Sequence, residues 1–501
     1  MTRTLIVWGT SSGAGKSWLS TALCRVAARR GINVAPFKAQ NMSNNARVVP
    51  RGPGADETGL GEIGSAQYFQ ALAARQRPHG GFNPVLLKPE RDTASQVVLG
   101  GVADAALSRL PWRERSAHLA VAAEAAFRRL AAAHELLVVE GAGSPAEINL
   151  APQDYVNLGV ARWAQTLGPT AALLVSDIDR GGSFAHVHGT WALLPDDLRG
   201  LLQGYVLNRF RGDAALLAPG PQQLQALTGV PLAGVIPMHR DHGLPEEDGL
   251  LDGWNGRPHG DPVRLRVAVL APPRISNLDE FLPLVRVPGV QLRWVRSAAE
   301  LEGVDWVVLP GSKQASGDLA WLRQQGLADA VQRHAAAGGA VLGVCGGLQM
   351  LGHSLHDPAG HDGEAFHTRE GLGLLGLSTH FGPTKHLRTA PVRFAQPQGP
   401  WAALQGVQAE AYEIRCGHTV ADSASTTAVL HDDDGQAIGW QQGRVMGVYA
   451  HGLFESPAVL QALLGATVPT LEDTFETLAD LVERHLDPAL LARLLGRPAR
   501  Q

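Results

Sequence analysis

Cysteine is scarce in this chain, and its scarcity excludes two kinds of protein. Among 501 residues there are three cysteines, Cys24, Cys345 and Cys416. Three thiols cannot form the disulfide framework of a small secreted domain, and their spacing matches no zinc-binding pattern. We therefore expect a reducing compartment, in which a thiol stays free to react.

Excess positive charge and long apolar runs are also missing. The formal net charge is −4 and the basic residues are scattered, which argues against a nucleic-acid binder. No apolar run reaches the roughly 18 residues of a membrane span, and no charged and apolar leader precedes the first predicted strand. We expect a cytoplasmic protein that acts on small molecules, with neither nucleic acid nor a membrane as partner.

Short aliphatic segments alternate with longer Ala- and Leu-rich ones, which is typical of parallel strands joined by crossover helices. A first series of predicted strands covers residues 5–8, 34–37, 136–139, 172–176, 204–207 and 232–236. A second series covers residues 265–270, 291–295, 306–309, 341–344 and 445–449. The segment between the two series is rich in Gly, Pro, His and acidic residues, which indicates a linker.

The pattern predicts an α/β protein with two tandem domains, because 501 residues exceed what one core can hold. The first domain is predicted to span residues 1–238 and the second residues 263–460, with the linker at 239–262. Apolar residues near helical spacing in 461–501 predict a helical extension that packs on the second domain.

A glycine-rich loop between the first predicted strand and an apparent helix is the motif of a phosphate site. It reads Gly-Thr-Ser-Ser-Gly-Ala-Gly-Lys-Ser, and its first glycine stands one residue earlier than in the strict Walker spacing. Backbone N–H groups and the helix N-terminus can face an anion there, and the lysine can reach the β- and γ-phosphates. We expect ATP phosphates to be bound by Gly9, Thr10, Gly13, Gly15, Lys16 and Ser17.

Carboxylates that could hold Mg²⁺ beside this loop follow two apolar strands. Glu140 and Asp177 end such strands, and Glu62 precedes an Ala-rich helix. Hydroxyl and carboxylate oxygens are the ligands that Mg²⁺ prefers, so all three join Ser17 as predicted ligands. Lys38, just past another strand, is predicted to bind an anionic substrate.

A second site is predicted at Cys345, which ends the apolar run 340–344 and is followed at once by Gly346 and Gly347. A strand that ends at a cysteine and turns through glycines presents the sulfur as nucleophile elbows do. The N-terminal amides of the next helix favour the thiolate. We expect a reactive cysteine here rather than an inert core thiol.

His451 follows another apolar strand and is the best-placed base for that cysteine. A Cys–His pair at strand ends suits a glutaminase, in which a thiolate attacks an amide, forms an acyl-enzyme and releases ammonia. The oxyanion is expected to be bound by the N–H of Gly346 and by the turn that contains Gly311.

Several motifs along almost the whole chain resemble the cobyric acid synthase family, the glutamine-dependent amidases of the cobalamin pathway. They are Pro-Phe-Lys-Ala-Gln-Asn-Met-Ser at 36–43, Asn-Pro-Val-Leu-Leu-Lys-Pro at 83–89, Glu-Gly-Ala-Gly-Ser-Pro-Ala-Glu at 140–147 and Asp-Ile-Asp-Arg-Gly-Gly at 177–182. The second half adds Pro-Gly-Ser-Lys at 310–313, Val-Cys-Gly-Gly at 344–347 and His-Gly-Leu-Phe at 451–454.

The resemblance implies a synthetase domain related to dethiobiotin synthetase, followed by a class I glutamine amidotransferase domain. It implies that ATP phosphorylates peripheral carboxylates of a corrin ring and that ammonia displaces the phosphate. The substrate would be adenosylcobyrinic acid a,c-diamide, amidated at b, d, e and g. It also implies that Asn208 contacts adenine. The sequence is compatible with a homo-oligomer.

Three positions depart from the family pattern. Many members carry aspartate where this loop has Gly13, and the usual Tyr-Glu-Ile-His ends here in Arg415. Standard class I triads place a glutamate two residues after the histidine, where this chain has Leu453. Glu413 and Glu455 both remain candidates for the residue that orients His451.

Two alternative functions stay open at this stage. The first is cobyrinic acid a,c-diamide synthase, which performs the same chemistry at other carboxylates but lacks the Asn-Met-Ser and Ile-Asp-Arg-Gly-Gly blocks. The second is a partition-type ATPase switch. Such switches carry a lysine near the start of the loop, where this chain has Thr10 and Ser11, and they have no second domain with a nucleophile elbow.

Overall fold

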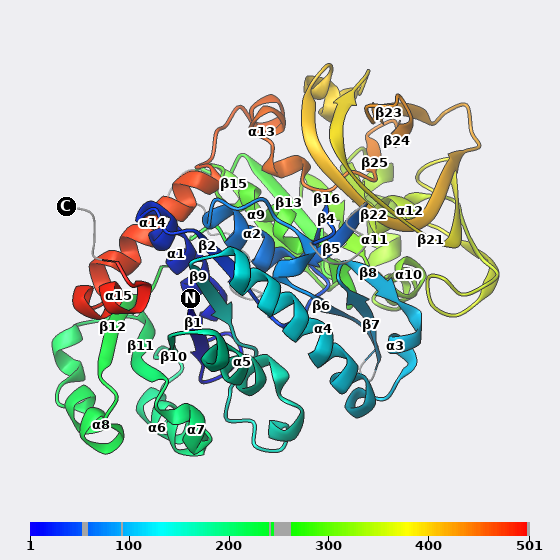
Figure 1. Ribbon diagram of the computed structural model, residues 1–501. Helices are drawn as coiled ribbons and strands as arrows, with labels where there is room; N and C mark the ends of the chain where they lie inside the picture. Colours follow the sequence, from blue (N-terminus) through cyan, green and yellow to red (C-terminus); the bar gives the residue numbers. More distant parts are fainter. Residues whose placement is uncertain (53–58, 92–93, 240–241, 245–261, 498–501) are drawn as a thin grey trace.

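Two α/β domains lie side by side in the computed structural model (Figure 1), which describes residues 1–52, 59–91, 94–239, 242–244 and 262–497. Each domain is built on its own sheet. Most of the predicted linker, 239–262, lies outside the described residues. All eleven predicted strands are present, so the α/β prediction is confirmed.

The first domain contains a six-stranded sheet whose strands are all parallel. In spatial order the strands are β12 (Leu232–Pro237), β11 (Leu202–Phe210), β10 (Thr170–Asp177), β1 (Arg3–Gly9), β9 (Leu136–Glu140) and β2 (Val34–Phe37). The central strands are apolar along their length because helices cover both faces of a parallel sheet. Side chains from Leu5 to Trp8 are at most 1% exposed.

One face of this sheet is covered by α1 (Lys16–Arg29) and α2 (Ser65–Ala73), and the other by α4 to α8. The second group comprises α4 (Trp112–Ala133), α5 (Val160–Leu167), α6 (Ser183–Leu193), α7 (Asp196–Arg199) and α8 (Gly220–Thr228). Helix α3 (Ala105–Arg109) contacts β7 (Ala94–Leu99), a strand of a smaller sheet. Both layers are Ala- and Leu-rich, as the sequence indicated.

The C-terminal helices belong to the first domain, so the prediction that 461–501 packs on the second domain is wrong for most of that segment. Helices α14 (Leu471–His485) and α15 (Pro488–Leu495) bury Phe475, Leu478 and Leu491 in the same core as α1. In Figure 1 these red helices lie beside the blue α1 and the green β12. Acidic residues of α14 also pair with arginines of α1, which supplies charge complementarity that apolar periodicity does not reveal.

Two small sheets extend the first domain toward the second, and neither was predicted. One has the order β3-β6-β7-β8, and the other is the hairpin of β4 and β5. Their bounds are β3 (Gln40–Met42), β4 (Ala46–Pro50), β5 (Leu60–Gly64), β6 (Val85–Arg91), β7 (Ala94–Leu99) and β8 (Val102–Asp104). Strand β4 contacts β21 and β22 of the second domain.

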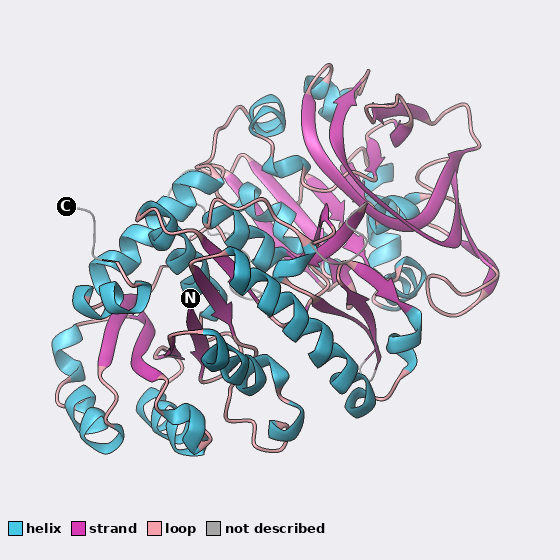
Figure 2. Cartoon of the chain, viewed as in Figure 1, coloured by secondary structure: helices cyan, strands magenta, loops and turns pink. Residues whose placement is uncertain are grey.

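The second domain contains an eleven-stranded mixed sheet. Its parallel part is β15 (Val290–Val295), β13 (Leu265–Leu270), β16 (Trp306–Leu309), β18 (Ala340–Val344) and β25 (Val445–Val448). The rest is mostly antiparallel and contains β24 (Ala437–Gln442), β23 (Thr427–His431), β21 (Leu377–Phe394), β22 (Gln408–Ala421), β19 (Ser354–Asp357) and β20 (Phe366–Glu370). Figure 2 shows the long strands β21 and β22 curving together along one side of the domain.

Helices of the second domain pack on its parallel strands around one core. They are α9 (Leu282–Val285), α10 (Ala315–Gln324), α11 (Leu327–Ala336), α12 (Gly346–Leu351) and α13 (Pro457–Leu464). Among the helices of the described chain, none combines the length and apolar character needed to cross a membrane.

Candidate active sites

The glycine loop connects β1 to α1, and its conformation depends on two glycines. Gly13 and Gly15 have φ angles of 69° and 102°, a region in which L side chains are strained. A Cβ at Gly15 would lie 2.0 Å from Nδ2 of Asn208. The Asn208 amide in turn donates to the carbonyl of Ala14 at 3.0 Å. Asn208 therefore supports the loop from β11, which is separated from β1 by β10 in the sheet.

Lys16 lies over the loop because two carbonyls hold its ammonium group. Its Nζ donates to the carbonyl oxygens of Ser11 at 2.9 Å and Gly143 at 3.0 Å. The hydroxyl of Thr10 donates to Ser176 at 3.2 Å. These contacts place a positive charge at the carboxyl end of the sheet, where parallel α/β folds bind their ligands.

Glu140 is the centre of a buried polar cluster beside the loop. It accepts hydrogen bonds from the Ser17 hydroxyl at 2.8 Å, from Lys38 Nζ at 2.9 Å and from the Gln70 amide at 2.5 Å. Burial opposes its charge, but these three donors outweigh burial and lower the pKa of Glu140. The structure thus brings Ser17, Lys38 and Glu140 together.

Glu62 and Asp177, the other two predicted magnesium ligands, are engaged elsewhere. The carboxylate of Glu62 is paired with Lys88 and with Lys385 of the second domain. Burial opposes its charge, yet the two lysines lower the pKa of Glu62 to about 2. Asp177 pairs with Arg209 at 3.1 Å and Arg180 at 3.3 Å. Among the described residues, the hydroxyl of Ser17 is hydrogen-bonded to Glu140 and to neither of these two carboxylates.

The residues present fit a magnesium ion at Ser17 and Glu140. A hydroxyl and an ionised carboxylate lie 2.8 Å apart at the start of α1 and the end of β9, and both are the hard oxygen donors that Mg²⁺ prefers. Within the described residues, one group of three or more His, Cys, Asp or Glu side chains has its potential metal-ligand atoms close together, and it consists of Asp432, Asp433 and Asp434. That group pairs with Arg388 and includes none of the predicted site residues.

Cys345 lies at a strained turn between β18 and α12. Its φ and ψ are 49° and −104°, which is unusual for a residue other than glycine. The next two positions need glycine, because a Cβ at Gly347 would lie 2.0 Å from the Leu309 carbonyl oxygen. The side chain of Cys345 is almost buried, and its Sγ lies 3.4 Å from the carbonyl of Ile414. The turn has the geometry of a nucleophile elbow.

His451 shares this site, and the side chains of Glu280 and Cys345 both act on the charge of its imidazole. Its Nδ1 lies 2.9 Å from Oε1 of Glu280, and the other oxygen of Glu280 accepts from the Gly452 N–H at 2.9 Å. Burial opposes a charge on His451, but Glu280 and Cys345 outweigh it and raise the pKa of the imidazole to about 10. The second ring nitrogen of His451 is thereby left for the sulfur.

Glu280 resolves the open question of which acid orients His451. Glu413 instead pairs with Arg415 at 2.8 Å, and Glu455 pairs with Arg47. Glu280 lies in the short 3-10 helix 278–281, 171 residues before the histidine. No spacing rule connects such distant positions, so the sequence alone could not single it out.

The backbone around Cys345 offers a pair of N–H groups. A Cβ at Gly346 would lie 2.8 Å from the Ser312 nitrogen, so the two backbone segments approach closely. Ser312 is in β17 (Gly311–Ser312), which pairs antiparallel with β14 (Ile275–Ser276). The N–H of Lys313 donates to the carbonyl of Arg274. Successive N–H groups of a strand point to opposite sides, so the N–H of the preceding residue, Ser312, points away from β14.

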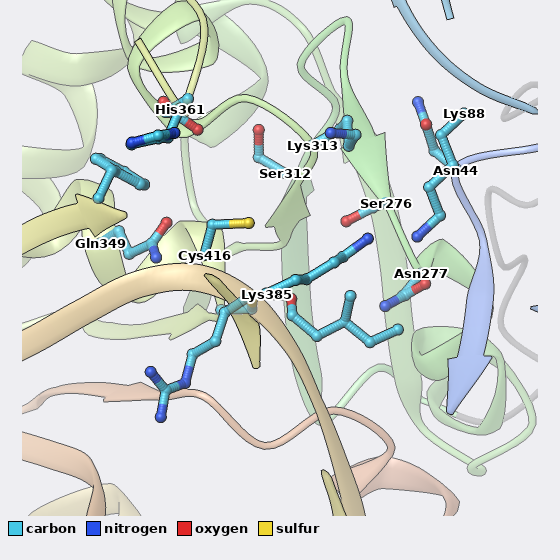
Figure 3. A pocket seen from close by; sticks show the side chains of 15 residues that line it. Asn44, Lys88, Ser276, Asn277, Ser312, Lys313, Gln349, His361, Lys385 and Cys416 are labelled. Atoms are coloured by element: carbon cyan, nitrogen blue, oxygen red, sulfur yellow. Dashed lines mark hydrogen bonds between the residues drawn. The ribbon is translucent and has the colours of Figure 1, made fainter. Parts of the chain in front are cut away.

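A pocket of about 610 Å³, including its open mouth, lies in front of Cys345 between the two domains. Figure 3 shows Gln349 and His361 on one wall and Asn44 and Lys88, from the first domain, on the opposite wall. The pocket is also lined by Lys313, Lys385, Arg415 and Cys416. The guanidinium of Arg415, which replaces the usual histidine, lies 4.2 Å from the ring centre of Tyr449.

Comparison with known proteins assigns both halves of the chain. Residues 5–250 match the model of the CobQ/CobB/MinD/ParA nucleotide-binding domain, and residues 266–459 match that of the CobB/CobQ-like glutamine amidotransferase domain. A protein from Leptothrix cholodnii named cobyric acid synthase is 59% identical over 99% of this chain and 97% of its own length. Its namesake from Methylibium petroleiphilum is 60% identical, with the same coverage.

This chain belongs to the cobyric acid synthase family. The family assignment confirms the resemblance read from the motifs, the order of the two domains and the class of enzyme, a glutamine-dependent amidating ligase. The nucleotide-binding domain of the cobyric acid synthase family also supports the use of ATP.

Proposed function

We propose that this protein is a cobyric acid synthase that amidates the b, d, e and g carboxylates of adenosylcobyrinic acid a,c-diamide, using ATP and glutamine. One observation carries the proposal: a phosphate loop and a Cys–His–Glu site occur on a single chain that matches named cobyric acid synthases over 99% of its length. Glutamine provides the nitrogen, and ATP activates the acceptor carboxylate.

In the first domain, the loop glycines and Lys16 bind the ATP phosphates, with Gly9, Thr10, Gly13 and Gly15 forming the cradle. Mg²⁺ would be held by Ser17 and Glu140, and when bound it would neutralise charge on the phosphates. Lys38, 2.9 Å from Glu140, orients the acceptor carboxylate toward the γ-phosphorus. The carboxylate oxygen attacks that phosphorus, ADP leaves, and an acyl phosphate results.

Ammonia then attacks the acyl carbon, the C–O bond to phosphate breaks, and the amide forms with loss of inorganic phosphate. The acyl phosphate must be kept from water, which would hydrolyse it. In this proposal Asn208, which supports the loop at Gly15, also contacts the adenine. Neither Glu62 nor Asp177 is needed for this arrangement.

In the second domain, the sulfur of Cys345 attacks the carboxamide carbon of glutamine. His451 donates a proton to the departing nitrogen, so ammonia leaves and a thioester remains. Glu280 fixes the ring so that its free nitrogen faces the sulfur. The developing oxyanion is bound by the N–H of Gly346 and by the N–H of Ser312 in the turn that begins at Gly311. Water, deprotonated by His451, then releases glutamate.

The two half-reactions need opposite environments, because the thioester requires water and the acyl phosphate excludes it. Separate domains meet both needs, and ammonia passes between them. A cytoplasmic location forms part of the proposal, since Cys345 must stay reduced. The substrates are small molecules.

The test is an assay of the purified protein with ATP, Mg²⁺, glutamine and defined corrin acids, in which products are resolved by mass. Conversion of the a,c-diamide by four successive amidations supports the proposal. Conversion of cobyrinic acid only as far as the a,c-diamide would instead identify the second candidate, cobyrinic acid a,c-diamide synthase. ATP hydrolysis without any amidation would contradict both.

A further inference from the structure

A buried arginine of the first domain reaches the glutaminase site of the second. Arg47 is the second residue of β4, and its side chain is 3% exposed. The guanidinium donates to both oxygens of Glu455, at 3.0 Å and 2.6 Å, and also to Asp279. Both carboxylates belong to the second domain, so Arg47 ties the two domains together through charge.

Both partners of Arg47 lie close in the sequence to His451 or to the acid that holds it. Asp279 directly precedes Glu280, and Glu455 lies four residues beyond the histidine. The guanidinium carbon also lies 5.0 Å from the ring centre of Tyr412. That ring stacks on the imidazole of His451, with ring centres 5.2 Å apart and planes inclined by 21°.

Strand β4 also fixes the backbone that carries Glu280. The Ala46 N–H donates to the side chain of Asn277 at 2.9 Å, and the Leu278 N–H donates to the side chain of Asn45 at 3.2 Å. Asn277 has a φ of 54°, a left-handed conformation that such side-chain contacts help to hold. The turn into the 3-10 helix of Glu280 is therefore set by residues of the first domain.

The same hairpin connects to the phosphate loop. Strand β4 pairs with β5, and helix α2 begins at the next residue after β5. Gln70 of α2 donates to Glu140 at 2.5 Å, and Glu140 accepts from Ser17 of the loop. A continuous set of packed elements thus extends from the ATP site to Arg47.

Arginine suits this position better than lysine. Two carboxylates must be paired at once, and the planar guanidinium offers parallel N–H donors together with a face that stacks on an aromatic ring. Removing the charge would leave Asp279, which is fully buried, and Glu455, which is partly exposed, without their cation next to Glu280. The disturbance would fall on the acid that orients the imidazole.

We propose that Arg47 is a positioning residue through which the synthetase domain holds His451 and Glu280 in the arrangement needed for glutamine hydrolysis. The inference rests on the proposed glutaminase role of Cys345. It makes ammonia production depend on correct docking of the domain that consumes ammonia.

The experiment compares Arg47→Met with Arg25→Met in the full chain. Arg25 is the control because its side chain is fully buried, it pairs with two carboxylates, Glu472 and Glu476, and it lies 5.3 Å from the ring centre of Phe475; its two carboxylates are more exposed than those of Arg47. It has no contact with His451. Both variants are assayed for amidation with glutamine and with ammonium salt as nitrogen source, and both are checked for folding.

We expect Arg47→Met to lower glutamine-dependent kcat by about tenfold or more and to change the ammonia-dependent rate by less than about twofold. Arg47→Lys should recover part of the loss. Arg25→Met should change both rates by the same factor. The pH profile of Cys345 alkylation by iodoacetamide should shift in Arg47→Met and stay unchanged in Arg25→Met, since destabilisation alone does not move it.

Equal effects of Arg47→Met on both nitrogen sources, or an unshifted alkylation profile, would overturn the inference. If Arg47→Met does not fold, Asn45→Ala serves instead, because it removes one acceptor from the Leu278 N–H and leaves the buried charges paired; the same split, of smaller size, is expected, and its absence would count against the inference. Retention of glutamine-dependent activity in Cys345→Ala would instead disprove the proposed function itself.

Discussion

The phosphate site and the thiol site are assembled in different ways. At the first, Gly13, Gly15, Lys16 and Ser17 are consecutive or nearly so, and one strand, one turn and one helix bring them together. At the second, Cys345, His451 and Glu280 come from three separate segments, and the last two are 171 residues apart in the sequence.

This difference decides how each site depends on the rest of the molecule. A local loop keeps its shape as long as its own strand and helix persist. A site assembled from distant segments depends on every contact that holds those segments, and here several of them come from the other domain. We therefore expect the thiol site to be the more sensitive of the two to changes at the domain interface.

Cys345→Ala should produce the largest difference between glutamine-dependent and ammonia-dependent amidation. Without the sulfur no thioester can form, so glutamine-dependent amidation should fall by at least about 10⁴-fold. Amidation supported by ammonium salt should stay within about twofold, because the ATP site does not use the thiol. Parallel rate measurements with the two nitrogen sources provide the check. Loss of both activities in a folded variant would contradict the division of labour.

Lys16→Ala should have the opposite pattern. Removing the ammonium that faces the phosphates should lower amidation by about 10² to 10³-fold with either nitrogen source. The rate at which glutamine is hydrolysed to glutamate, measured without the corrin substrate, should change little. The control is Arg128→Ala, which removes an exposed cation of α4 that pairs with Glu124 at 2.6 Å. Retained amidation in Lys16→Ala would show that the loop is not the ATP site.

Glu280→Gln should affect only the glutaminase, by about 10²-fold, since the amide keeps the shape but loses the charge that orients the imidazole. Glu280 favours the protonated ring, so its removal lowers the pKa of His451 from about 10. The alkaline limb of the glutaminase pH profile should therefore move to lower pH. Glu413→Gln is the control, because its carboxylate pairs with Arg415 instead. An equal effect of both variants would rule out the special role of Glu280.

Glu62→Gln should have the smallest effect on rate and distinguishes two roles for this acid. As an ion-pair partner of Lys88 and Lys385 it is not a metal ligand, so the Mg²⁺ concentration at half-maximal rate should stay the same. Its folded pKa of about 2 lies below the ordinary value of 4.5, so its stabilising contribution is full above pH 4.5 and is lost as the pH falls toward 2.

Thermal unfolding at pH 7 and at pH 3 checks this second role. The wild-type protein should lose more stability than Glu62→Gln between these two pH values, on the order of 2 kcal/mol for a shift of this size. A raised Mg²⁺ requirement in the variant would restore the role as metal ligand that the sequence suggested.

The sequence was most informative where structure is local. All eleven predicted strands exist because buried parallel strands are short, apolar runs bounded by polar turns. The elbow at Cys345 was visible for the same reason, since a tight turn needs glycines next to the nucleophile. The loop at Lys16 is another contiguous motif of this kind.

What escaped prediction depends on contacts between distant segments. Glu280 carries no motif of its own, and only the fold brings it to His451. Glu62 was predicted to be a metal ligand because a carboxylate next to a helix start fits several roles. Its lysine partners come from β6 and from β21 of the other domain, and only the folded structure brings them to Glu62. The small strands β3 to β8 were missed because their polar residues hide the alternation on which strand prediction depends.

The placement of α14 and α15 has a topological consequence. Because both ends of the chain belong to the first domain, the polypeptide passes between the domains twice, once near residues 239–262 and once after α13. A cut in the backbone at one crossing would therefore leave the two domains covalently joined through the other. The docked arrangement of the domains is thus held twice by the chain itself, in addition to the contacts at their interface.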